Sequence, residues 1–458
     1  MIDLDGVVRR SYTGPCFDEQ EFDLNVFVPA LRSVLAKYGI KYTGQPLPAD
    51  DDLADRVFAA GIELYEKVGT YCVDTGRVIR FSRDEIAEAL RNAPSKAVFG
   101  EGDNQKALVS RAPESPERPW CFLGAGGAAV SDERKFFALV RGYAKIPDID
   151  SLTAPSLANV DGHLVRGYSP LEIEACIRSV RLAREATAAA GKPGLPIMNS
   201  IATAASAAGK IAGSSFGLRP SDGWLIGSRV ELKVDFERLC EVAYVRRLGG
   251  HVVAETAPVL GGYAGGPEGV AVTNVAYHVH CIMVLQGSCQ LTFPFHSTLQ
   301  CTSSPDVMWA VSISTQAITR NSHFPYLNLV YVASGPLTRQ CLYEVASVTL
   351  NAVVSGGGLE ALGVARATEV DHMTPVEPRF AAAVALAASG MKRDEARPIV
   401  GELISRYGGN LKHAPKGSPF HLAWDAKEDK PVAEYEDLVG SVSEELREMG
   451  VRLGALRW

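Results

Sequence analysis

The sequence predicts an α/β protein built on a (β/α)8 barrel, with additional helices before and after it. From about residue 115 to about residue 375, short apolar runs alternate with longer helical patterns. Such alternation is typical of parallel strands joined by right-handed helical crossovers. No G-x-G-x-x-G follows the first of these strands, which disfavours a dinucleotide-binding sheet. So many repeated units therefore fit a closed barrel.

The composition is that of a globular protein with a sizeable core. The chain has 458 residues, of which 47% are apolar and 22% charged, and its net charge is −7. The acidic balance disfavours nucleic acid as a partner, because phosphate binding needs a basic surface. No apolar run is long enough to span a membrane, and the N-terminus does not resemble a secretory signal. The nine cysteines are scattered without C-x-x-C pairs, so we expect reduced thiols and a cytoplasmic protein.

Residues 1–95 are predicted to form an N-terminal helical segment. Apolar residues recur at helical spacing in two stretches, which end at Gly39 and Gly69. A third helix begins with a capping box, in which Ser82 is followed three residues later by Glu85, and it stops before Pro94. We expect these helices to form a layer on the barrel.

Residues 96–375 are predicted to form the barrel, and residues 376–458 a C-terminal helical segment packed on its outside. Helical patterns cover 169–191, 235–250 and 304–321 within the barrel. The predicted strands are 120–124, 195–200, 251–255, 289–295 and 327–333, with weaker candidates at 149–156 and 222–228.

One strand end stands out as a candidate site, since barrel enzymes place their chemistry where the strands end. Glu255 closes a predicted strand and precedes a loop rich in glycine. Glycine permits positive φ and a close approach of the backbone to a ligand. A turn rich in glycine beside a surface glutamate would explain the pattern equally well. The loop glycines are Gly261, Gly262, Gly265 and Gly266.

Other strand ends supply aromatic and polar side chains. If they face one mouth, the pocket combines a carboxylate with aromatic rings, which suits a cation. Alternate strand residues face opposite sides, so we expect about half of them to point away. The candidates are Met198, Asn199, Ser200, Phe293, Phe295, His296, His323, Phe324, Tyr326, Asn328 and Tyr331.

The sequence predicts no intrinsic metal. His278 and His280 form an H-x-H, but they lie in a helical pattern, where residues two apart do not share a face. The cysteines are too dispersed to form a metal site. The sequence also lacks H-E-x-x-H, G-x-S-x-G and P-loop motifs.

Several blocks resemble the monomethylamine methyltransferase family, and the likeness runs nearly end to end. The most specific are Tyr71–Arg77, which reads Y-C-x-D-T-x-R, and "GGYAGG", which contains Tyr263. The stretches "SPLEIEA", "AGKPG" and "SGPLTRQCLYEVAS" follow the family's order. The resemblance implies a (β/α)8 barrel that passes a methyl group to a corrinoid protein. It also implies that the corrinoid is carried by this partner, with no cofactor bound by the chain itself, and that the chain forms hexamers.

The sequence departs from the family's pattern where the family is most distinctive. Met198 stands at the place of the family's pyrrolysine, so the reactive ring imine is absent. Glu255 matches the family's strand-end glutamate and is the sole polar member inherited there. At the positions of the family's other polar site residues, this sequence has apolar residues: Ile201 or Ala202, Leu329, and the region around Leu225.

These departures predict a methyl donor that needs less activation than monomethylamine. A quaternary amine or betaine loses its methyl group to give a neutral tertiary amine, which requires no proton. Glu255 would balance the positive charge, and aromatic rings, with Tyr263 and Leu329 among the binding residues, would hold the methyl groups. One alternative is a methoxy or thioether donor, with Glu255 or a histidine as general acid. Another is a barrel that no longer transfers methyl groups and serves as a binding protein, a lyase or a hydrolase.

Overall fold

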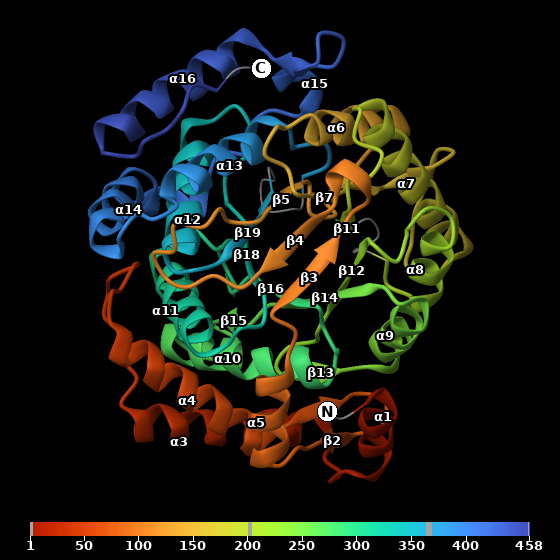
Figure 1. Ribbon diagram of the computed structural model, residues 1–458, viewed down its shortest axis with the longest axis vertical. Helices are drawn as coiled ribbons and strands as arrows, with labels where there is room; N and C mark the ends of the chain where they lie inside the picture. The colour runs from red at the N-terminus through yellow and green to blue at the C-terminus, as the bar shows by residue number, and fades with distance from the viewer. Residues whose placement is uncertain (1–2, 200–203, 363–368, 457) are drawn as a thin grey trace.

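Eight parallel strands form a nearly closed barrel at the centre of the computed structural model, which describes residues 3–199, 204–362, 369–456 and 458 (Figure 1). The seven predicted strands are present, and an eighth, which the sequence patterns did not single out, precedes the C-terminal helices. In chain order they are β5 (Cys121–Gly124), β7 (Ser151–Thr153), β11 (Ile197–Asn199), β12 (Gly223–Gly227), β14 (His251–Thr256), β16 (Cys289–Thr292), β18 (Tyr326–Val330) and β19 (Gly358–Leu362).

Except for β11 and β12, each strand pairs with its neighbour along the chain, and β19 pairs with β5, so the sheet curls back on itself. At the remaining seam, β11 lies against β12: a Cβ added at Gly223 would be 3.1 Å from the Met198 Cα atom. The register of β11 on β7 shifts between Ile197 and Asn199, which makes this strand irregular.

Eight helices surround the strands, as the alternating pattern predicted. Their buried faces carry apolar residues that pack on the outer side of the sheet. They are α6 (Glu133–Ala144), α7 (Pro170–Ala189), α8 (Ala207–Ser214), α9 (Phe236–Leu248), α10 (Pro267–Met283), α11 (Pro305–Asn321), α12 (Arg339–Val354) and α13 (Val376–Ala388).

The N-terminal segment lies along one side of the barrel, beside α10 and α11 (Figure 1). Its helices end at Gly39 and Gly69, and Ser82 and Glu85 form the predicted capping box. Strand β13 (Lys233–Val234), from a loop of the barrel, pairs with this segment in a small sheet. The elements of the segment are α1 (Leu4–Thr13), α2 (Glu19–Glu21), the π-helix η1 (Phe22–Phe27), α3 (Val28–Tyr38), α4 (Asp51–Val68), β1 (Thr70–Cys72), β2 (Arg77–Ile79) and α5 (Arg83–Asn92).

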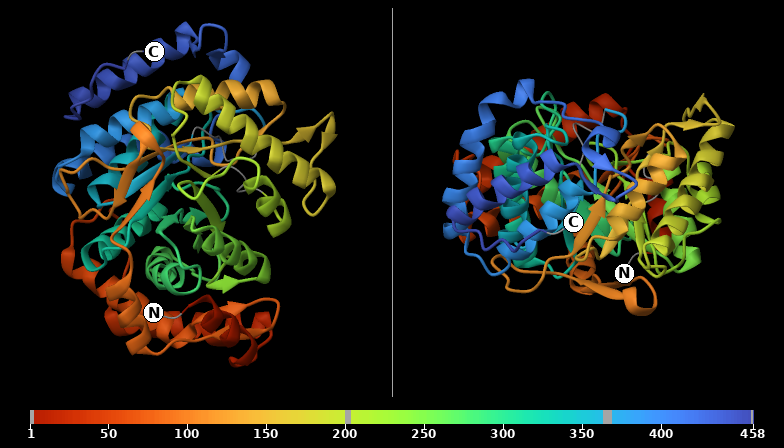
Figure 2. Two further views of the ribbon diagram at one scale, coloured as in Figure 1. Left: turned by 45° about the vertical axis from the view of Figure 1, so that its right-hand side comes forward. Right: turned by 90° about the horizontal axis from the view of Figure 1, so that it is seen from above.

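A hairpin of β3 (Lys96–Phe99) and β4 (Lys106–Val109), joined through the 3-10 turn η2 (Gly102–Asn104), lies across the amino ends of the barrel strands (Figures 1 and 2). The Phe99 ring packs 5.9 Å from Trp120, which precedes β5, and 4.6 Å from His251, which begins β14. The hairpin therefore covers the end of the barrel opposite the expected site.

Short paired strands lie near the carboxyl ends of the barrel strands. The β9–β10 hairpin projects outward beside α7 (Figure 2). These strands are β6 (Ala129–Val130), which pairs with β8 (Ser156–Leu157), β9 (Asn159–Val160), which pairs with β10 (His163–Leu164), and β15 (Val259–Leu260), which pairs with β17 (Phe295–His296).

The C-terminal segment packs outside α12 and α13 (Figure 1). It comprises α14 (Arg393–Tyr407), η3 (Gly408–His413), α15 (Phe420–Ala423), the pair β20 (Trp424–Asp425) and β21 (Lys430–Pro431), and α16 (Ala433–Glu448). Among the described helices, none combines the length and the apolar character needed to cross a bilayer.

Candidate functional site

The alternation of side chains along β14 turns Glu255 toward the inside of the barrel. Val252 and Ala254 belong to the core beneath the outer helices, whereas Val253 belongs to the core that contains the barrel interior. Glu255 is two residues beyond Val253 and so faces the same way. It pairs with Gly227, where an added Cβ would lie 3.0 Å from the Glu255 Oε2 atom. Glycine at the end of β12 thus leaves room for this carboxylate.

Glu255 is deep in the protein but keeps some accessible surface. Burial raises the pKa of its carboxyl to about 7, while the positive charges of Lys210 and Arg238 act in the opposite direction. Among the described residues no side chain forms a hydrogen bond or ion pair with this carboxylate. The group can therefore take up or release a proton near neutral pH.

A second carboxylate, Glu360 on β19, joins Glu255 inside the barrel. Glu360 is 1% exposed and pairs in register with Leu329 on one side and Phe122 on the other. Burial raises its pKa to about 8, and the charge of Glu255 contributes to this increase. The sequence patterns did not single out Glu360. The signal was a glutamate within the apolar run "GGGLEAL", where a buried strand is expected to carry only apolar side chains.

Two neutral polar side chains lie near Glu360 without forming well-formed hydrogen bonds to its carboxylate. Thr153 and Asn199 approach the carboxylate and oppose the rise of its pKa. The Asn199 amide nitrogen, however, donates its well-formed hydrogen bond to Thr153 Oγ1, at 3.0 Å. Both oxygens of Glu360 and the Asn199 Oδ1 atom are buried without a well-formed hydrogen bond from the described residues. The site is thus rich in acceptors and short of donors.

The nearest cations are engaged elsewhere. Lys210 of α8 donates to the carbonyl oxygen of Leu225 on β12 at 3.0 Å and pairs with Glu241 of α9 at 2.9 Å. Arg238 donates to the Ala205 carbonyl oxygen and lies 3.9 Å from Asp235. Neither cation forms an ion pair with the two glutamates, so neither fully offsets the cost of ionising them in the barrel interior.

Aromatic rings gather next to the ends of β16 and β18. Phe293 lies two residues beyond Leu291, the register partner of Glu255, and so continues the same face. Its ring stacks on Phe295 with centroids 5.8 Å apart and meets Tyr331 edge-on at 6.4 Å. All three rings are partly exposed. Glu255 and these three rings thus lie toward the same end of the barrel.

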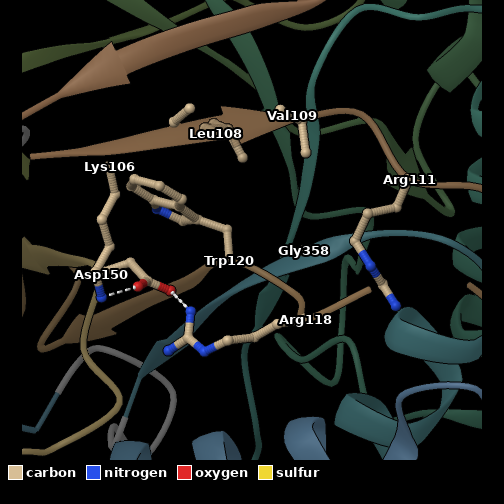
Figure 3. A pocket seen from close by; sticks show the side chains of 9 residues that line it. Lys106, Leu108, Val109, Arg111, Arg118, Trp120, Asp150 and Gly358 are labelled. Carbon is tan, nitrogen blue, oxygen red and sulfur yellow. Dashed lines mark hydrogen bonds and ion pairs between the residues drawn. The ribbon is translucent and has the colours of Figure 1, made fainter. Parts of the chain in front are cut away.

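A pocket of about 320 Å³ lies at the opposite end, under the β3–β4 hairpin (Figure 3). Its one carboxylate, Asp150, is fully buried and pairs with Lys106 at 2.6 Å and with Arg118. Arg111 donates to four backbone carbonyl groups nearby. These polar groups are thus partnered within the chain, and the Lys106–Asp150 ion pair links strand β4 of the hairpin to the residue just before β7.

The sequence as a whole matches one family. A family model described as "Monomethylamine methyltransferase MtmB" matches residues 2–451. The chain belongs to this family. Monomethylamine methyltransferase MtmB1 of Methanosarcina barkeri is 27% identical over 444 residues, which cover 96% of both chains. The MtmB protein of Methanosarcina mazei shows the same identity and coverage.

Solved structures of MtmB agree with the barrel described above. The crystal structure of the Methanosarcina barkeri monomethylamine methyltransferase matches with a TM-score of 0.94 at 27% identity, and the match covers 98% of both chains. A crystal structure of a hydroxylamine complex of MtmB matches equally well. The predicted fold is therefore confirmed, and the chain is a member of a methyltransferase family.

Within the barrel of this MtmB family member, Met198 lies closer to the amino ends of the strands than Glu255 does. Met198 is fully buried, and its Cγ atom would be 3.1 Å from a Cβ at Gly223, the first residue of β12. Glu255 instead pairs with Gly227, the last residue of that strand. Leu225 lies between Gly223 and Gly227 on β12. Its side chain is buried, as is that of Leu329. Ser200, Ile201 and Ala202 lie outside the described residues.

The glycine loop of this MtmB member forms a tight turn between β15 and α10. Gly261 has φ +86° and donates to the Gly265 carbonyl oxygen at 2.9 Å, and Gly265 itself has φ +72°. Gly262 belongs to the same turn, and Gly266 is the N-cap of α10. Tyr263 is 43% exposed, and its ring lies 5.9 Å from Lys233 Nζ, beside the N-terminal segment. The turn itself therefore accounts for glycine at positions 261 and 265.

Several histidines and strand residues have structural partners. His278 bonds Gln290 and Ser322, and His280 bonds Thr70 and Ser228. Burial lowers their pKa values to about 4 and about 3, respectively. The described residues contain no group of three or more side chains that could hold a metal ion.

The remaining strand-end candidates also have partners within the chain. His296 Nδ1 accepts from two backbone amides, and His323 bonds the Ala93 carbonyl oxygen. Phe324 packs on His278, and Tyr326 and Asn328 bond side chains of the outer helices.

Proposed function

We propose that this chain transfers a methyl group from a methylated ammonium compound to a corrinoid protein, and that its substrate is a quaternary amine or betaine rather than monomethylamine. The observation that carries the proposal is the inward-facing Glu255, which no described side chain neutralises. A carboxylate in such a place is costly unless a cation or a donor meets it. The family of the chain supports methyl transfer as the reaction.

The choice of a quaternary donor rests on the leaving group. Methyl transfer from a quaternary ammonium releases a neutral tertiary amine, so the site need not deliver a proton. A primary amine needs covalent or acid assistance, and a methionine thioether at position 198 cannot form an adduct with an amine. The apolar Leu225 and Leu329 offer no side-chain hydrogen bonds to hold one. Catalysis would then consist of orientation and charge stabilisation.

Each part of the site has a defined task in this proposal. Glu255 binds the positive charge, and the rings of Phe293, Phe295 and Tyr331 contact the methyl groups, at about 0.5–2 kcal/mol for each cation–π contact. The corrinoid, held by the partner protein, supplies the nucleophile. The partner approaches the end of the barrel where Glu255 lies, because the β3–β4 hairpin covers the other end. We further propose that the chain works as a homo-oligomer in the cytoplasm.

The test is a spectroscopic assay with a corrinoid protein reduced to Co(I). We expect conversion to methyl-Co(III) on addition of a quaternary amine or a betaine, and none with monomethylamine. Methylation from monomethylamine would refute the substrate assignment. Absence of methylation from every methylated donor would instead favour a barrel repurposed for binding or for another reaction.

One observation favours an oxygen- or sulfur-bound methyl donor as the second candidate. A carboxyl group with a pKa of about 7, as at Glu255, holds a proton at neutral pH and can act as a general acid. Methoxy and thioether compounds therefore belong in the same assay. Methylation from them should be lost on Glu255→Gln substitution if Glu255 protonates the leaving group.

A further inference from the structure

Glu360 differs from Glu344 and Glu377, two other buried glutamates, in what surrounds its carboxylate. Glu344 accepts hydrogen bonds from Ser303, Ser334 and the Ala333 amide, and Glu377 accepts from Thr374 and Tyr435. Glu360 is equally buried, yet neither of its oxygens receives a well-formed hydrogen bond from the described residues. Buried polar groups are almost always satisfied, so an exception of this kind among the described residues points to a bound partner.

The surroundings of Glu360 indicate the chemistry of that partner. Its register neighbours, Leu329 and Phe122, offer apolar surface, and the nearby Asn199 Oδ1 atom is a further acceptor without a well-formed bond. Glu255 adds a second carboxylate close enough for its charge to affect the titration of Glu360. Two carboxylates among apolar and aromatic side chains complement a compact organic cation and repel an anion.

We propose that Glu360 is a second substrate-binding carboxylate, which acts with Glu255 to select a cationic ligand over a neutral molecule of the same shape. The inference rests on the proposed function, and it adds a specificity-determining residue to the site. Glu360 comes from β19, on the opposite side of the barrel order from β12 and β14, so the two carboxylates approach the ligand from different strands.

The pair also determines how many protons accompany binding. Two carboxylates without a cation between them do not both ionise readily, so the empty site holds a proton near neutral pH. A bound cation stabilises the ionised forms and releases that proton. Lys210 and Arg238 are the charged groups that act on Glu255, and Thr153 and Asn199, both uncharged, are those that approach Glu360. None of these four can take the place of the incoming cation.

The experiment compares choline with its uncharged carbon analogue, 3,3-dimethylbutan-1-ol, by isothermal titration calorimetry. Methylammonium, tetramethylammonium and glycine betaine complete the panel. We expect the native protein to bind at least one cation and to bind the neutral analogue far more weakly. In Glu360→Gln, cation affinity should fall by about 10-fold or more, as expected for loss of a hydrogen bond or contact to a charged group, while binding of the neutral analogue stays unchanged.

Glu344→Gln is the matched control. It alters an equally buried glutamate that has its full set of donors, so it should lower the melting temperature and leave cation affinity unchanged. If Glu360→Gln does not fold, Glu360→Asp is the alternative variant. Aspartate keeps the negative charge but holds it further from the ligand, so cation binding should weaken less than expected for Glu360→Gln. Titrations in two buffers of different ionisation enthalpy should show proton release in the native protein and less of it in the Glu360 variant.

Three results would overturn the inference: no cation of the panel binds, the neutral analogue binds as tightly as choline, or Glu360→Gln keeps native affinity. The outcome is separable from that of the proposed function. Cation binding that depends on Glu360, without methylation of a corrinoid protein, would defeat the proposed function alone. Methylation from a cation at the native rate and affinity in Glu360→Gln would defeat the role of Glu360 and leave methyl transfer standing.

Discussion

Glu255 and Glu360 show how much a residue's role depends on its neighbours. Glu255 could be singled out from the sequence because it closes a strand before a distinctive loop. For Glu360 the sequence shows only a glutamate within an apolar run, and its role becomes visible from β19 lying next to β5 and from the absence of well-formed hydrogen bonds to it from the described residues. Conversely, Met198 has a buried position beside Gly223, set by an irregular strand whose register no pattern of single residues reveals.

At Glu255, substitution by glutamine keeps the shape of the side chain and removes its charge. The affinity for a cationic ligand should fall by about 1.5–3 kcal/mol, the usual worth of a hydrogen bond to a charged group, while folding stability at neutral pH stays the same or rises. Calorimetric titration of the native protein and the variant measures the first effect, and thermal unfolding the second. Glu185→Gln, on the exposed side of α7, is the control. Unchanged affinity in Glu255→Gln would contradict the role assigned to Glu255.

The two carboxyl groups should also leave a signature in the pH dependence of stability. Their folded-state pKa values, about 7 and about 8, lie above the ordinary value of 4.5. Their contribution to stability is therefore complete below about pH 4.5 and is lost as the pH rises through about 7 to 8, because the unfolded chain ionises first. The double variant Glu255→Gln/Glu360→Gln should gain stability relative to the native protein as the pH increases from 5 to 8.5. Thermal unfolding across this range, with a constant difference between the two proteins, would exclude the proposed titration.

At the scale of elements, the sequence was most informative where the pattern is local. The helical spacing, the capping box and seven strands were all predicted from short stretches, and the structure contains them. The eighth strand was missed because its glutamate interrupts an apolar run. The Gly261–Gly266 loop remained ambiguous, since positive φ values serve a turn and a ligand contact equally well. The structure shows that the turn between β15 and α10 uses a positive φ at Gly261 and at Gly265.

Two glycines of this loop permit a paired test. Alanine at Gly265 meets open space and should cost about 1 kcal/mol, the usual penalty of a left-handed conformation. Alanine at Gly261 adds a Cβ that would lie 2.6 Å from Ser297 Oγ, so Gly261→Ala should cost clearly more. Chemical denaturation of both variants measures the difference. Equal costs would mean that the loop moves freely away from Ser297.

At the scale of the whole molecule, the N-terminal segment shares the barrel's core instead of merely covering it. A Cβ at Gly61 of α4 would lie 2.4 Å from the Val275 side chain of α10. The same core cluster contains residues from α3, α4, α10, α11, β12 and β14. Resemblance over nearly the whole chain was therefore a better guide to this arrangement than any division into segments.

Gly61→Ala should accordingly lower the stability of the entire protein, by about 1–3 kcal/mol as for overpacking of a core. Gly401→Ala is the matched control, since Gly401 lies inside helix α14 with open space around its Cα atom. That control should stabilise the protein by about 0.5–1 kcal/mol. Differential scanning calorimetry should show one shifted transition for Gly61→Ala. A separate early transition would mean that the N-terminal segment unfolds on its own.

The assembly of the chain can be measured directly. The resemblance that the sequence shows implies hexamers, and we expect an oligomer in solution. Multi-angle light scattering coupled to size-exclusion chromatography should report a mass several times that of one chain. A monomer at micromolar concentration would contradict the expectation.

The hairpin over the amino ends of the barrel has a consequence for the order of events during turnover. Phe99 and its neighbours occupy the end through which a small molecule could otherwise pass. If a protein as large as a corrinoid carrier docks at the opposite end, small molecules and the carrier compete for the same opening of the barrel. The donor must then arrive before the carrier, and the demethylated product must wait for the carrier to depart. Steady-state rates should consequently decline at high carrier concentration, and a tightly held carrier would slow the cycle more than a loosely held one.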